Sequence, residues 1–190
     1  MTTISIFGNG NMGTAIAGLL GAGGAEIQQV GEGETEELSG DIVVLAVPYA
    51  ALASIAEQYG EQLAGRTVVD ITNPLDFETF DRLVVPVGSS AAAELAAKLP
   101  SSKVLKAFNT TFAATLGSKR VGDLTTTVLV AGDDADAKAT LIAAVQAGGA
   151  DAIDAGSLAR AHELEAMGFL QLTLAASEKI AWTGGFGIVR

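Results

Sequence analysis

The sequence predicts an α/β fold, a Rossmann-like doubly wound parallel sheet with a short helical segment at the C-terminus. Three observations predict it. Short apolar runs alternate with longer helical patterns up to about residue 155, and one of them, IVVLAV (42–47), is continuous, as is typical of a strand buried on both faces. The glycine-rich stretch GNGNMG (8–13) follows the first apolar run, and a helical tail follows residue 155. Alternating strands and helices predict a parallel sheet that helices cover on both faces.

The elements follow from these patterns in chain order. TISIF (3–7) predicts the first strand, and the small residues of 11–22 predict a helix that packs closely against it. Pro48, after the strand at 42–47, suits the first turn of a helix to about residue 59. The other elements that we expect are strands over 25–30, 66–71, 103–108, 125–132 and 150–154, and helices over 89–98, 134–147 and 157–182.

Composition excludes several classes of function. A formal net charge of −11 repels nucleic-acid backbones and anionic lipid, so we expect a small-molecule or protein partner, no nucleic acid and no membrane. The one membrane-like run, residues 42–56, is too short to span a bilayer, and Pro48 interrupts it. The N-terminus lacks a basic segment followed by an apolar core, and the chain has no cysteine, which fits a reducing compartment. We therefore expect a cytoplasmic protein.

The stretch GNGNMG matches the G-x-G-x-x-G pattern of dinucleotide-binding folds. Gly8 allows the tight turn, Gly10 lets the backbone approach a pyrophosphate, and Gly13 lets the following helix pack closely on the sheet. The helix N-terminus adds free N–H groups and a partial positive charge. The predicted cofactor-binding residues of this turn are Gly8, Asn9, Gly10, Asn11, Met12 and Gly13. The motif predicts a dinucleotide-binding domain.

Acidic residues follow the second predicted strand. Glu32 or Glu34, in VGEGETEE, is placed to hold the ribose hydroxyls of NAD, whereas arginine there would favour NADP, and no basic residue lies between Met1 and Arg66. Charge alone therefore favours NAD. Two alternatives remain: the glutamates form a solvated loop, or backbone N–H groups and Thr35 bind a phosphate.

Polar and cyclic side chains follow the carboxyl ends of three predicted strands, where ligands of open parallel sheets bind. AVPY (46–49), ITNP (71–74) and FNTT (108–111) supply hydrogen-bonding groups and ring-sized walls. The candidate cofactor-binding residues there are Pro48, Asn73, Pro74, Phe108, Asn109 and Thr110. Ordinary turn chemistry is the alternative for each residue alone.

The chain offers no evident catalytic acid or base. Its only histidine, His162, lies on the predicted last helix, where a surface or capping role is commoner than catalysis. The stretch GDDADAK (132–138) lacks the glycine and distal glutamate of a calcium loop, so we interpret Asp133 as a helix N-cap and expect no metal site. A dinucleotide site without acid or base fits hydride transfer between two redox rings, which needs no catalytic side chain.

The C-terminal segment is apolar on nearly every side over residues 164–176, which implies burial all round. A subunit interface is the preferred interpretation, and packing across the edge of the sheet is the alternative. Trp182 and Phe186, among glycines, form either a flat wall beside a ring or a lid on the core.

Several stretches in order, among them GNGNMGTAIA, DIVVLAVPYAAL, VVDITNPLDF, KVLKAFNTTFA and GGFGIV, resemble the deazaflavin (factor 420)-dependent NADP oxidoreductases, including small bacterial dinucleotide-binding relatives. The resemblance implies hydride transfer between deazaflavin and NADP in a homodimer, with a Rossmann domain over 1–155 and a helical C-terminal segment over 156–190. It also implies roles for individual residues. The pyrophosphate would be held by Gly8–Gly13, and the path from adenosine to nicotinamide would be lined by Ala46, Val47 and Pro48. The residues beside the nicotinamide would be Asn73, Asn109 and Thr110. The pocket of the second ring would be shaped by Gly184 and Gly185.

The chain departs from this family after the second strand, where the family has a basic stretch and this chain has GEGETEELSG. NADP and NAD therefore remain alternatives, and the second redox partner is deazaflavin, a flavin or a quinone. Two other functions remain open. One is an imine reductase of the pyrroline-carboxylate type, which shares GNGNMG but has a longer helical C-terminal domain. The other is a non-catalytic dinucleotide sensor.

Overall fold

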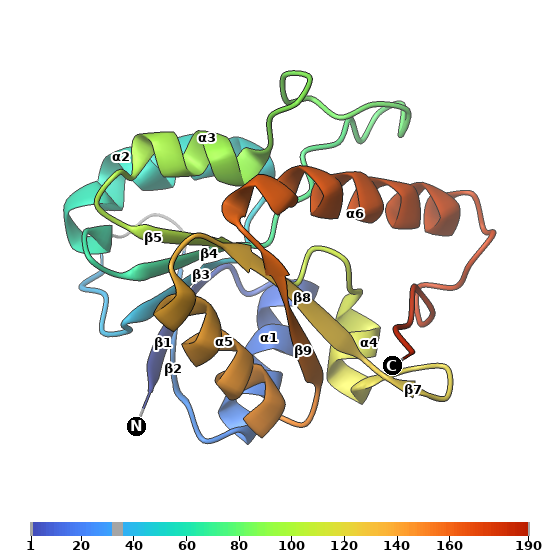
Figure 1. The fold of residues 1–190 in the computed structure, drawn as a ribbon, viewed down its shortest axis with the longest axis horizontal. Helices are drawn as coiled ribbons and strands as arrows, with labels where there is room; N and C mark the ends of the chain where they lie inside the picture. The colour runs from blue at the N-terminus through green and yellow to red at the C-terminus, as the bar shows by residue number, and fades with distance from the viewer. Residues whose placement is uncertain (1, 32–35, 190) are drawn as a thin grey trace.

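A seven-stranded sheet in the order β2-β1-β3-β4-β5-β8-β9 forms the centre of the structure, a computed structural model that describes residues 2–31 and 36–189 (Figure 1). The strands of this sheet are β1 (Thr3–Phe7), β2 (Glu26–Val30), β3 (Ile42–Leu45), β4 (Thr67–Asp70), β5 (Lys103–Lys106), β8 (Thr127–Gly132) and β9 (Asp151–Gly156). Strands β1 to β5 are parallel, so their carboxyl ends share one edge. This edge is where the glycine turn and the asparagines at 73 and 109 lie.

Helices cover both faces of the sheet, as the doubly wound fold requires (Figure 1). Their bounds are α1 (Asn11–Ala22), α2 (Leu52–Leu63), α3 (Ala91–Lys98), α4 (Ala113–Ser118), α5 (Ala135–Ala147) and α6 (Ala161–Ala176), with single 3-10 turns at Tyr49–Ala51 and Leu158–Arg160. Alternate residues of each strand feed two separate cores. Ile16 of α1 and Leu141 of α5 pack on one face, and Leu52 of α2 and Leu95 of α3 pack on the other. The predicted fold class is confirmed.

The sheet is not parallel throughout, which corrects the expected topology. Strand β8 runs antiparallel to β5, and β9 is parallel to β8. The reason lies in the connection. From the carboxyl end of β5 the chain passes through α4 and a short hairpin, β6 (Arg120–Val121) and β7 (Leu124–Thr125), and enters β8 without a crossover to the other edge. Both α4 and the hairpin were missed, since they are too short for a periodic pattern.

Two helix boundaries also differ from expectation. Asp134, not Asp133, caps α5 by accepting a hydrogen bond from the N–H of Ala137, whereas Asp133 accepts one from the N–H of Leu158. The last helix ends at Ala176, not at residue 182, because Glu178 is left-handed (φ 59°) and Lys179 N–H bonds back to Leu174 O, a typical helix stop.

The expectation that 164–176 is buried on all sides does not hold within one chain. One face of α6 is buried, including Leu164 and Gly168, whereas Leu170 is 52% exposed. None of the helices in the described part of the chain is long and apolar enough to cross a bilayer.

Candidate functional site

The three glycines of the 8–13 turn differ in what requires them. Gly8 has φ +91°, and a Cβ there would lie 2.2 Å from the carbonyl oxygen of Ala46. A Cβ on Gly13 would lie 2.0 Å from the carbonyl oxygen of Gly8. The fold itself therefore excludes side chains at both positions. Gly10 has φ −69°, which any residue adopts, and no described atom lies within 4 Å of its Cβ position. The fold therefore does not require a glycine at position 10, whereas a ligand that approaches the backbone there would.

Two cavities lie on either side of this turn. The smaller one, about 260 Å³, is bordered by Gly8 and Asn9, and the larger one, about 680 Å³, by Asn11 and Met12. The smaller cavity is lined by Phe7, Gly8, Asn9, Val30, Gly31, Val47, Pro48, Ala51, Ser54, Ile55, Gln58 and Tyr59. The larger cavity is lined by Asn11, Met12, Thr14, Ala15, Ile71, Asn73, Asn109, Thr111, Phe112, Ala113, Ala114, Leu172 and Trp182. Gly10 sits in sequence between the residues of the two cavities.

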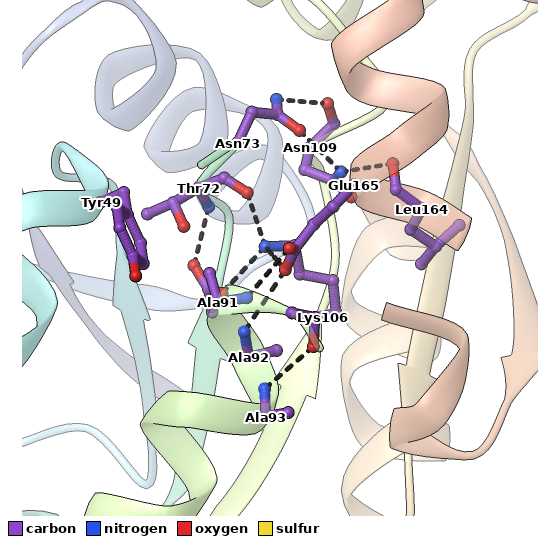
Figure 2. Close-up of polar contacts among 12 residues, drawn as sticks. Tyr49, Thr72, Asn73, Ala91, Ala92, Ala93, Lys106, Asn109, Leu164 and Glu165 are labelled. Atoms are coloured by element: carbon purple, nitrogen blue, oxygen red, sulfur yellow. Dashed lines mark hydrogen bonds and ion pairs between the residues drawn. The ribbon is translucent and has the colours of Figure 1, made fainter. Parts of the chain in front are cut away.

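The two rim asparagines are paired with each other. Asn73 Nδ2 donates to Asn109 O (2.9 Å), and Asn109 Nδ2 donates to Asn73 Oδ1 (2.9 Å) and to Leu164 O (2.8 Å) (Figure 2). Both partners of Asn109 Nδ2 are acceptors, so the network orients the amide and leaves Oδ1 as its oxygen. That oxygen is buried and has no hydrogen-bond partner among the described residues.

The turn and the rim fit a dinucleotide. The first-turn N–H groups of α1 face no acidic side chain in that turn, and a helix N-terminus with a glycine beside it is suited to bind a phosphate. The larger cavity is mostly apolar, and the amide side chains of Asn73 and Asn109 border it, which suits a flat redox ring with polar edges.

Other predicted site residues lie outside both linings. Phe108 is 0% exposed and packs in the core that α1 covers, so its ring is not a cavity wall in this conformation. Thr110 and Pro74 are buried, and Ala46 packs against Gly8 and Gly13. The walls come instead from Phe112 and Trp182, whose ring centroids are 5.0 Å apart. Gly184 and Gly185 belong to the tail near Gln171 and line neither cavity.

None of the described residues that line the larger cavity carries an acid or a base. Tyr49 lies outside that lining and donates to Glu94 Oε2 (2.5 Å). Burial raises the pKa of Tyr49 to about 12, and the hydrogen bond to Glu94 acts in the same direction, so the phenol stays protonated near neutral pH. His162 lies on the first turn of α6, where Nδ1 is 3.0 Å from Ser89 O.

We expect the His162→Ala variant to keep its turnover within about twofold of wild type, because the imidazole lines neither cavity and bonds to a carbonyl of the chain. Steady-state assays of both proteins check this. A loss of turnover of about 100-fold in a folded variant would show that a protein base takes part.

One group of buried charges was not anticipated from the sequence. Lys106 Nζ lies 2.8 Å from Asp70 Oδ2 and 2.8 Å from Glu165 Oε1, and all three side chains are at most 1% exposed. Figure 2 shows Lys106 and Glu165 facing each other. Burial raises the pKa of Glu165, against the opposing effects of Lys106 and of the N–H of Ala91. Asp70 and Lys106 are direct neighbours in the register of β4 and β5. The sequence did contain a signal for this pair, because Asp70 and Lys106 are charged residues of opposite sign at the ends of two apolar strands.

The sequence and the fold can now be compared with known proteins. No protein-family model matches the chain. It is 34% identical over 166 residues to the F420-dependent NADP reductase of Methanocaldococcus jannaschii, a match that covers 85% of this chain and 74% of the relative. The chain belongs to the F420-dependent NADP reductase family. The family places it among the NAD(P)-dependent oxidoreductases, as predicted.

Solved structures agree with this membership. A protein of Arthrobacter sp. FB24, provisionally named as an F420-dependent NADP reductase, superposes with a TM-score of 0.84 at 25% identity, and the match covers 100% of both chains. An imine reductase of Streptomyces aurantiacus shares the fold, with a TM-score of 0.63 at 16% identity. That match covers 90% of this chain and only 61% of the imine reductase. The reductase family therefore accounts for the whole length of this chain.

The residues predicted to select between NAD and NADP follow the second strand. Glu32, Glu34 and Thr35 lie outside the described residues. Beside them, Glu36 Oε1 accepts a hydrogen bond from the N–H of Gly31 (3.4 Å), and Gly31 borders the smaller cavity. Arg66 follows at the amino edge of the sheet, where its guanidinium donates to Gly40 O and to Gln62 O.

Proposed function

We propose that this protein transfers hydride between NAD(P)H, bound across the Gly8–Gly13 turn, and a second flat redox partner in the larger cavity. The observation that carries the proposal is the pair of cavities on either side of the turn, with the open surface of Gly10 between their residues. A dinucleotide consists of two ring systems joined by a pyrophosphate, so its site needs two pockets that a phosphate-binding turn separates.

The bound nicotinamide supplies or accepts the hydride, and the chain's own residues bind and align the rings. The N–H groups at the start of α1 bind the pyrophosphate. Asn73, which is half-buried, bonded to Asn109 and borders the larger cavity, hydrogen-bonds one ring. Phe112 and Trp182 wall the larger cavity, exclude water and hold the rings in contact.

The family membership supports one candidate for the second partner. The named activity of the Methanocaldococcus relative supports F420, a deazaflavin, as the partner of this chain. A flavin or a quinone also presents a flat ring with polar edges, and both remain candidates for the same cavity.

A homodimer formed through the C-terminal segment 156–190 is part of the proposal. Leu170, in the middle of α6, is 52% exposed, and Trp182, in the tail that follows α6, is 51% exposed. Large exposed apolar side chains on one segment are typical of an interaction surface.

The proposal is tested by mixing the protein with NADPH or NADH and a panel of F420, FMN, menadione and a cyclic imine, and following the absorbance of the reduced dinucleotide. Turnover with F420, FMN or menadione supports the proposal. Turnover with the cyclic imine alone identifies an imine reductase, and binding without any turnover identifies a dinucleotide sensor.

We expect NADH to bind at least as tightly as NADPH. The 2′-phosphate of NADP is usually held by arginine or lysine, whereas this chain has neither between Met1 and Arg66, and Arg66 is engaged at the opposite edge of the sheet. Calorimetry with both dinucleotides measures the difference. A preference for NADPH of about tenfold or more would contradict this expectation.

A further inference from the structure

We infer that Lys106, Asp70 and Glu165 are positioning residues, which hold α6 against the carboxyl edge of the sheet and thereby set the wall of the larger cavity. The inference rests on the proposed function only in assigning that cavity to the second redox ring. None of the three side chains lines either cavity, so any effect on a ligand passes through other residues.

Each N–H group of the Lys106 ammonium has an acceptor. It donates to Asp70 Oδ2 (2.8 Å) and to Thr72 O (2.5 Å), and Glu165 Oε1 is 2.8 Å away. Three acceptors around one ammonium satisfy its three N–H groups. Asp70 Oδ1 in turn accepts from the N–H of Thr72 (2.7 Å). The cluster therefore fixes the turn that leads from β4 to Asn73.

Glu165 extends the cluster to two helices. It projects from α6, and its carboxylate also accepts from the N–H of Ala91 (2.9 Å) and of Ala92 (3.3 Å), in the first turn of α3 (Figure 2). These N–H groups have no partner within their own helix. One carboxylate thus connects the sheet, the start of α3 and α6.

Two further contacts place α6 on the rim. Leu164 O accepts from Asn109 Nδ2, one residue before Glu165. One turn later Gly168 passes so close that a Cβ there would lie 2.2 Å from Asn73 Oδ1. The helix therefore rests directly on the two asparagines that line the cavity, and a small displacement of α6 moves it against both.

The far half of α6 carries the cavity wall. Leu172 lines the cavity directly. Gln171 Oε1 accepts from the N–H of Phe186 (3.2 Å), which ties the tail containing Trp182 to the same helix. Trp182 completes the wall against Phe112. The position of α6 thus decides the width of the cavity at this side.

A buried ion cluster is well suited to position but is poor at adding stability. Removing three charged groups from water is costly, and apolar replacements of similar volume are often as stable. Charged hydrogen bonds instead specify the orientation of the bonded groups and the distance between them. Packing alone would let α6 slide along the apolar surface below it, whereas the bonds of Glu165 specify one location.

The test compares Glu165→Gln with Glu163→Gln. At position 165 an amide offers one acceptor oxygen, so its NH2 group faces either the N–H of Ala91, or both the ammonium of Lys106 and the N–H of Ala92, and α6 must shift. Glu163 lies on the same helix in an exposed ion pair with Arg160 (2.8 Å), which makes it the matched control. Both variants are first checked for cooperative unfolding.

Two readouts separate position from stability. Trp182 is the only tryptophan, and without any ligand its acrylamide quenching constant should rise about twofold in Glu165→Gln and stay unchanged in Glu163→Gln. With F420 as acceptor, KM should rise about tenfold in Glu165→Gln, while kcat and the Kd for NADPH stay within about threefold of wild type. A lowered Tm with unchanged quenching and unchanged KM would overturn the inference.

Gly168→Ala provides an independent displacement of α6 that leaves the charges intact, and it should raise the same quenching constant. If Glu165→Gln does not fold, this variant decides: an unchanged quenching constant would overturn the inference. If wild type reduces none of the acceptors, the proposed function fails, whereas the quenching comparison still tests the position of α6.

Discussion

The Gly10→Val variant is expected to bind dinucleotide at least about 100-fold more weakly than wild type, a loss of about 2.7 kcal/mol, with its unfolding temperature unchanged. The backbone at Gly10 has φ −69°, and no described atom lies within 4 Å of its Cβ position, so the fold accepts a valine. The valine methyl groups would instead occupy the space where a pyrophosphate must approach the N–H groups of α1. Calorimetry with NADPH and NADH, together with thermal unfolding, measures both quantities.

Gly18→Val is the matched control for this experiment. Gly18 lies in the interior of the same helix, and its Cβ position is also open, but it is eight residues beyond Gly10 and therefore away from the helix N-terminus that would bind the pyrophosphate. The control should bind both dinucleotides as wild type does. Equal affinity in Gly10→Val and wild type would show that the open surface at residue 10 is not the phosphate site, and the proposed function would lose its main support.

The Lys106→Met variant should show the largest loss of stability. Removing the ammonium leaves the carboxylates of Asp70 and Glu165 buried together without a cation. Breaking a buried ion pair by removal of one partner costs about 3–5 kcal/mol. For a chain of this length that lowers Tm by about 10 °C. Thermal unfolding of wild type and variant measures it.

The loss should depend on pH with a definite sign. Burial already raises the pKa of Glu165, and Lys106 opposes that rise, so the variant raises it further. A carboxyl group whose pKa is raised on folding contributes most below its unfolded pKa, and this contribution is lost as pH rises through the folded value. The difference in Tm between wild type and Lys106→Met should therefore widen as pH rises above the usual range of a glutamate pKa.

Lys138→Met is the control for the charge change. Lys138 Nζ bonds to Asp154 Oδ1 (2.7 Å), but the Asp154 side chain is 52% exposed. Water can solvate that carboxylate once the lysine is removed, so the loss should be about 1 kcal/mol or less. A loss at Lys106 that is no larger than at Lys138, or that shrinks as pH rises, would contradict the account of the buried cluster.

Most of the fold could be predicted because its signals are local. The continuous run at 42–47 and the motif at 8–13 each specify an element from adjacent residues. The antiparallel direction of β8 could not be predicted, because the residues of a strand do not indicate from which end of the sheet the chain enters it. The connecting element α4, six residues long, is shorter than a pattern needs to be recognised.

The candidate site divides in the same way. The glycine turn and the asparagines at 73 and 109 were predicted, since each follows a strand whose end could be located. The roles of Phe112 and of the Lys106 cluster depend on which segments meet in three dimensions. Glu165 in particular lies 59 positions after Lys106 and contacts it only because α6 returns to the rim of the sheet.

The ion cluster also imposes an order on biosynthesis. Asp70 and Lys106 leave the ribosome well before Glu165, and a chain that emerges from its N-terminus pairs these two first. Until the final helix arrives, the first turn of α3 has only water for the two N–H groups that the carboxylate later binds. The nascent protein thus stays unfinished at the carboxyl edge of its sheet until α6 has been made, and chains that stop before α6 should be prime substrates for cellular proteases.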